Sequence, residues 1–158
     1  TGLGVDTGAF ADWRGTWGKP GETGRGAYRA TLTELVEDAR TYPKEGLTPD
    51  QRIGFEVVET AFDSALKGMA LPYGDVAVGS WRNAPYIVIQ NVGGYLDFPR
   101  AMAATQPVKT AEDVDFYMAR LAEIPAVLEG ELERVKEARS FGVIPPGFLL
   151  EKTANQLE

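Results

Sequence analysis

One stretch of the sequence, from Thr110 to Ser140, repeats apolar residues at helical spacing and predicts a single long amphipathic helix. Thr110 is suited to cap the start of this helix. Gly142 follows its end, where glycine readily adopts the left-handed backbone conformation of a helix C-cap. Pro125 lies inside the pattern, and we expect it to kink the helix rather than divide it. The apolar face comprises Val114, Tyr117, Met118, Leu121, Ile124, Leu128, Leu132 and Val135.

The rest of the sequence divides into segments of different character. Residues 1–26 are rich in glycine and predict a loop with one short helical turn at residues 10–14. Residues 27–69 predict two helices, the second starting at Thr48, where Thr-Pro-Asp-Gln has the order of a capping box with proline at the first helical position. A final helix begins at about Pro146. We therefore expect an all-α single domain of four to five helices over residues 1–158.

Residues 70–109 differ from the helical segments because glycine, proline and aromatic residues interrupt any periodic pattern. We predict a Gly- and aromatic-rich irregular middle segment. The apolar run at residues 86–89 fits either a short buried strand or a turn of helix, and periodicity over so few residues does not decide between them. Helix with loop is the interpretation we favour.

Composition excludes several classes of function. The 158 residues carry a formal net charge of −7, and no basic cluster provides the electrostatic footprint of a nucleic-acid-binding protein. The absence of histidine and cysteine excludes thiolate nucleophiles, imidazole bases and zinc sites built from those ligands. No apolar run is long enough to predict a membrane span. The carboxylates of Glu56 and Glu59, and those of Glu129, Glu131, Glu133 and Glu137, are interpreted as solvated helix faces.

Several ordered motifs resemble one known family. They are APYIVIQNVGGY at residues 84–95, then FP at residues 98–99, AEDVDFYMARL at residues 111–121, and GVIPPGFLLEK at residues 142–152. In this order and spacing they resemble the N-terminal half of a large, mostly bacterial family catalogued as a domain of unknown function. The members of that family are helical proteins related to zinc metallopeptidases.

The resemblance implies a longer parent protein with a zinc-binding helix in its C-terminal half. This chain would then be a non-catalytic fragment without a metal or other cofactor of its own, and zinc is expected in the parent protein. By analogy with helical zinc peptidases, it would form one wall of the substrate cleft, with Tyr86, Gln90 and Tyr95 nearest the cleft. The resemblance also implies that the segment before the long helix often carries a histidine, where this sequence has Gln106, Pro107 and Val108.

The same interpretation identifies the missing C-terminal half as the partner. It also predicts self-association through apolar side chains that this half would cover, namely Phe148, Leu149, Leu157 and parts of residues 81–99. Family members often carry export signals, so a periplasmic or otherwise exported origin is an expectation from the resemblance, and the residues themselves do not exclude the cytoplasm. The alternative is an independent helical domain that binds a ligand or partner without catalysis.

Overall fold

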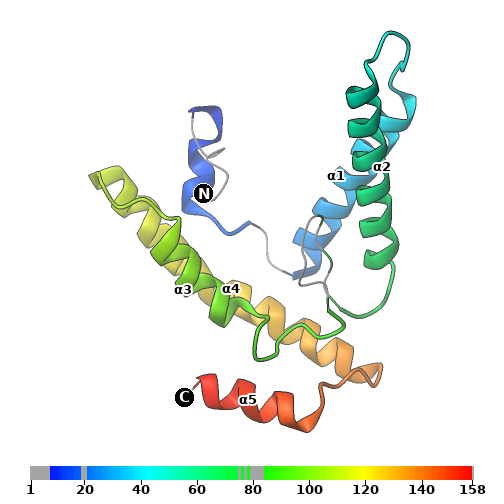
Figure 1. Cartoon of the computed structure of the whole chain (residues 1–158). Helices are drawn as coiled ribbons and strands as arrows, with labels where there is room; N and C mark the ends of the chain where they lie inside the picture. The colour runs from blue at the N-terminus through cyan, green and yellow to red at the C-terminus, as the bar shows by residue number, and fades with distance from the viewer. Residues whose placement is uncertain (1–7, 19–20, 75, 77, 79–83, 158) are drawn as a thin grey trace.

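The computed structural model describes residues 8–18, 21–74, 76, 78 and 84–157 (Figure 1). These residues form a 3-10 helix, η1 (Gly8–Gly15), and the α-helices α1 (Gly21–Thr41), α2 (Pro49–Met69), α3 (Gly94–Ala104), α4 (Ala111–Ser140) and α5 (Gly147–Leu157). No strand occurs in this part of the chain, where an isolated β-bridge pairs Ile89 with Val92. The predicted all-α class is confirmed.

The predicted helix ends are confirmed where the sequence carries capping residues. Thr48 Oγ1 accepts a hydrogen bond from Gln51 N, and Gln51 Oε1 accepts one from Thr48 N, at 3.3 and 2.9 Å. Thr110 forms the equivalent box with Asp113 at the start of α4. Gly142 has a φ of 78° after α4, as a left-handed cap requires. Pro125 lies within α4, which is continuous across it.

Two expectations about the remaining segments are wrong, and the alternative left open at residues 86–89 is resolved. Helix α1 already begins at Gly21, so part of the expected loop at residues 1–26 is helical even though that part contains several glycines. The segment 70–109 is not irregular throughout, because it contains α3. Residues 86–89 form neither a helix nor a strand, since they follow a bent path that closes on the Ile89–Val92 bridge.

Helix α4 is the element against which much of the chain packs. Helix α3 and η1 both contact α4, and α1 contacts it as well (Figure 1). Helices α1 and α2 form an antiparallel hairpin that extends away from α4, with Leu32, Val36, Ala39 and Ala65 buried in or near their contact. A second buried cluster, around Phe98 and Met102, lies where α3 meets α4.

Large apolar side chains remain exposed to solvent in this arrangement. On α4, Val114, Met118 and Leu132 are 45%, 58% and 51% exposed, and in α5 both Phe148 and Leu157 are 60% exposed. The chain has an accessible surface of 10433 Å², whereas a compact monomer of 17.2 kDa has about 7,800 Å². The helices therefore leave apolar faces that they do not cover themselves. Residues 81–83, part of the segment expected to associate, lie outside the described residues.

Candidate functional site between α3 and α4

An apolar groove of about 450 Å³ lies between α3 and α4. Side chains spaced three or four residues apart on each helix line it, because such spacing places them on one helical face. They include Tyr95, Phe98 and Met102 from α3 and Tyr117, Leu121 and Leu128 from α4. Phe98 and Met102 are buried, whereas Leu121 and Leu128 are 38% and 37% exposed. The groove is therefore open, with an apolar floor and wall.

Tyr95 supplies a polar group to this apolar groove. Its hydroxyl lies 3.0 Å from Ile89 O and 2.8 Å from Gln156 Oε1, so it links the start of α3 to the preceding turn and to α5. Burial raises the pKa of Tyr95, which keeps the hydroxyl protonated at neutral pH. The Tyr95 hydroxyl is therefore a neutral group that fixes the start of α3 to its neighbours, and it does not act as a base.

Glu131 fixes the start of α3 against α4. Its two carboxylate oxygens accept hydrogen bonds from Gly94 N at 2.9 and 3.1 Å. Gly93, the residue before the helix, has no side chain to cap it, so a carboxylate from another helix takes this role. The interpretation of Glu131 as part of a solvated face is wrong. A single glutamate within an acidic run gave no sequence signal for such a contact.

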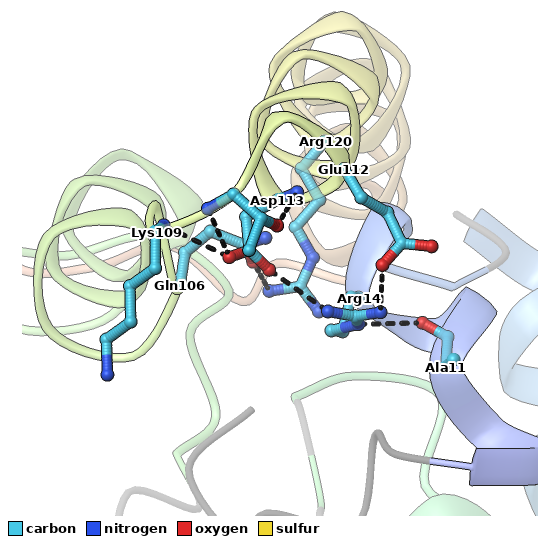
Figure 2. Close-up of polar contacts among 8 residues, drawn as sticks. Ala11, Arg14, Gln106, Lys109, Glu112, Asp113 and Arg120 are labelled. Atoms are coloured by element: carbon cyan, nitrogen blue, oxygen red, sulfur yellow. Dashed lines mark hydrogen bonds and ion pairs between the residues drawn. The ribbon is translucent and has the colours of Figure 1, made fainter.

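A buried arginine joins three segments next to this groove. Arg120 is 3% exposed, and its guanidinium donates to Gln106 Oε1 at 2.7 Å (Figure 2). It also donates to Trp13 O at 2.9 Å and to Thr16 O at 3.2 Å. The guanidinium carbon also lies 4.8 Å from the centre of the Trp17 ring. Trp17 in turn contacts Phe98, with ring centroids 4.8 Å apart. Arg120 thus connects the N-terminal segment to both walls of the groove.

Asp113 forms a second part of the same polar junction (Figure 2). Its carboxylate accepts hydrogen bonds from Lys109 N and Thr110 N, each at 3.0 Å, and pairs with Arg14 Nη1 at 3.0 Å. The backbone N–H of Lys109, together with contacts from Thr110 and Arg14, lowers the pKa of Asp113 despite its burial. Asp113 is therefore a charged cap of α4 that also holds η1.

The structure places the three predicted cleft residues apart. Tyr95 lines the α3–α4 groove, whereas Tyr86 lines a separate cavity of about 60 Å³ near the C-terminal end of α4, together with Val135, Val143 and Leu150. Gln90 is half-buried in the turn between Ile89 and Val92. These residues do not line one common pocket, and their role in binding a substrate stays a prediction.

Comparison with known proteins bears on the whole chain. A family model described as "Bacterial protein of unknown function (DUF885)" matches residues 1–158. The chain belongs to the DUF885 family. No curated protein and no solved structure matches the chain. The family that the resemblance indicated is thus confirmed. The description of this family does not state an activity.

The residues of this DUF885 chain do not fit a zinc site. The sequence has no histidine or cysteine, and among the described residues no three acidic side chains are placed to share a metal ion. Gln106, in the segment 106–108, has its side-chain oxygen occupied by Arg120. Within the same described part of the chain, no helix is long and apolar enough to cross a membrane.

Proposed function

We propose that this chain is the non-catalytic N-terminal helical part of a zinc-dependent peptidase or hydrolase, and that the α3–α4 groove forms part of one wall of the substrate cleft. Membership of DUF885 over residues 1–158 supports the family part of this assignment. The relation of that family to zinc metallopeptidases, and the location of zinc outside this chain, are parts of the proposal.

The observation that carries the proposal is the open apolar groove between α3 and α4, in a chain that has no histidine or cysteine. The groove of about 450 Å³ has the size and apolar lining of a binding site for a small molecule or for a peptide side chain. Tyr95, whose hydroxyl is bonded to Ile89 O and Gln156 Oε1, holds one end of the groove in place. A chain of this kind can bind and orient an apolar part of a substrate, while the bond-breaking chemistry requires groups from elsewhere.

The exposed faces of α4 and α5 support the same proposal. Val114, Met118 and Leu132 on α4, and Phe148 on α5, are apolar side chains in contact with solvent. Such side chains promote association with another surface, because their burial is favourable by about 25 cal/mol per Å². The C-terminal half of the parent protein is the partner that we propose for them.

The test uses the full-length parent protein. We expect it to contain zinc and to hydrolyse peptides in a chelator-sensitive way, whereas the 158-residue chain alone does neither. Ala103 lines the groove, so Ala103→Trp should fill it and raise KM for substrates with large apolar side chains by about tenfold, without changing zinc content. Ala126→Trp, on an exposed position of α4 outside the groove lining, is the matched control.

Two results would contradict the proposal. Absence of zinc and of any hydrolase activity in the full-length protein would remove the enzyme assignment. An active protein whose KM is unaffected by Ala103→Trp would separate the groove from the cleft. In the first case, tight binding of an apolar ligand by the 158-residue chain itself would favour the alternative, an independent helical binding domain, because the groove is formed within this chain.

A further inference from the structure

A second apolar groove lies on the α1–α2 hairpin, away from the α3–α4 groove. It has a volume of about 500 Å³ and is lined by Leu35, Ala39 and Tyr42 of the α1 side and by Gly54, Phe55 and Val58 of α2. Tyr42 stacks on Phe55 with ring centroids 4.7 Å apart. Leu35, Tyr42 and Val58 are 41%, 51% and 38% exposed. The hairpin thus has an uncovered apolar face.

The length of this groove matches a short stretch of helix. The lining residues extend from Leu35 to Tyr42 on one side and from Gln51 to Val58 on the other. At a rise of 1.5 Å per residue, each side is about 10 Å long, which is the distance between positions i and i+7 of an α-helix. A helix laid along the groove could therefore place its anchors at i, i+3 or i+4, and i+7 against both walls.

Two basic side chains of the hairpin are paired with carboxylates. Arg40 pairs with Glu59 at 3.0 Å and with Asp63 at 3.1 Å, and Lys67 pairs with Asp63 at 2.7 Å. Arg40 and Lys67 are thus held by carboxylates of α2. Neither basic residue lines the groove.

The edges of the groove are acidic. Asp38 lines the groove, and Glu34 lies one turn before it on the same side of α1. Asp50 lies one turn before Gly54 at the start of α2. All three are exposed, and within the described part of the chain none of them forms an ion pair. An apolar floor with acidic edges is complementary to an apolar surface with basic edges.

This charge distribution distinguishes between possible occupants. A second copy of the chain would bring the same acidic edges together, and each copy carries a net charge of −7, so like charges would oppose that contact. A small polar ligand would need convergent polar groups, but the Gln51 amide oxygen is already used in the capping box. A basic amphipathic helix meets neither objection.

We propose that the α1–α2 groove binds an amphipathic helix of a partner polypeptide, with apolar residues at i, i+3 or i+4, and i+7 and with Lys or Arg along both flanks. The bound helix completes a three-helix arrangement with α1 and α2 and covers Leu35, Tyr42 and Val58. This inference does not depend on the peptidase proposal, because it rests on a different surface.

Two synthetic peptides of about 18 residues test the inference. Both carry leucine at the anchor positions, but one has lysine and the other glutamate along the flanks. With the whole 158-residue chain, fluorescence anisotropy at about 20 mM salt should show about tenfold tighter binding of the lysine peptide. At about 500 mM salt the difference should disappear, because the flanking charges are screened.

Substitutions locate the binding surface. Val58→Glu should abolish binding of the lysine peptide, whereas Met118→Glu, at an exposed apolar residue of α4, should leave it unchanged. The double change Glu34→Lys and Asp38→Lys should reverse the preference in favour of the glutamate peptide. If circular dichroism shows that Val58→Glu does not fold, the test of the binding surface rests on the double change at Glu34 and Asp38, which are both exposed.

Several outcomes would overturn the inference. The first two are that the chain binds neither peptide, or that it binds both equally at low salt. The third is that Met118→Glu weakens peptide binding as much as Val58→Glu does. The fourth is that the double change at Glu34 and Asp38 does not make the chain prefer the glutamate peptide. A dimer in sedimentation analysis that Val58→Glu dissociates would identify a second copy of the chain as the occupant instead, and would equally contradict it.

Discussion

Arg120 Nη1 donates a buried 2.7 Å hydrogen bond to Gln106 Oε1 and so connects α4 to the residues that follow α3. The same guanidinium binds the carbonyl oxygens of Trp13 and Thr16. One side chain therefore satisfies acceptors from two segments that are far apart in sequence and joins both of them to α4.

Replacing Arg120 by methionine should lower the free energy of unfolding by about 3 kcal/mol, because it leaves buried acceptors without donors. Urea unfolding of the purified chain measures this change. Arg139→Met, at an exposed position near the end of α4, is the control and should change stability by less than about 0.5 kcal/mol. Equal effects of the two substitutions would mean that the Arg120 contacts are not formed in solution.

Replacing Thr48 by alanine should cost about 1 kcal/mol of stability, because Thr48 Oγ1 accepts a hydrogen bond from Gln51 N at the start of α2. Thr60→Ala, at an exposed position inside the same helix, lacks a capping role and should be neutral or slightly stabilising. Thermal and urea unfolding of both variants provide the comparison. A Thr48→Ala change within about 0.3 kcal/mol of wild type would show that α2 begins elsewhere.

Two glycine substitutions should have opposite effects. A Cβ on Gly94 would lie 2.6 Å from Phe98 Cε2 and 3.2 Å from Glu131 Oε2, so Gly94→Ala should destabilise the chain by about 1 to 3 kcal/mol. A Cβ on Gly26, inside α1, would meet no atom within 4 Å, so Gly26→Ala should stabilise it by about 0.5 to 1 kcal/mol. Differential scanning calorimetry of the two variants checks both signs.

The depressed pKa of Asp113 gives a pH dependence of stability. Because the folded-state pKa is lower than that of the unfolded chain, about 4, the charged carboxylate stabilises the fold above that pH. This contribution is lost as the pH falls through the folded-state pKa. Asp113→Asn should therefore melt at a lower temperature than wild type at pH 6 and lose less of its melting temperature on acidification to about pH 2.5.

Asp115→Asn, on the same helix but exposed, is the control for this measurement. Its melting profile should follow that of the wild-type chain. The pKa of Asp63 is also lowered, by Lys67 and Arg40. Asp63 is present in every variant, so its contribution to the pH dependence of the melting temperature cancels when the variants are compared. Parallel profiles of Asp113→Asn and wild type would contradict the assigned role of Asp113.

Local signals in the sequence predicted some elements well. Thr48, Thr110 and Gly142 act within a few residues of where they stand, and their helix ends could be recognised without knowledge of the rest of the chain. The start of α1 could not be recognised in this way, because glycine has a low helix propensity and several glycines lie between Gly21 and Gly26. Tertiary packing overrides that preference in the structure.

The candidate site was harder to predict for a related reason. Helix α3 contains Pro99 and begins at Gly94, which made its segment resemble a loop, and its start is capped by Glu131 from another helix. Tyr95 was recognised as a candidate, but its position relative to Tyr86 depends on how α3 and α5 lie on α4. Such contacts between distant segments leave no periodic trace in a single sequence.

The junction at Arg14 also has a consequence for the order of folding. Arg14 and Asp113 are separated by 99 residues, yet they form an ion pair at 3.0 Å. During synthesis the ribosome therefore releases η1 long before its binding surface on α4 exists. Loop closure over this distance has an entropic cost that local helix formation does not have. The α1–α2 hairpin can thus form early, while docking of the first segment waits until translation has passed Glu123, the residue that accepts a hydrogen bond from Trp17 N.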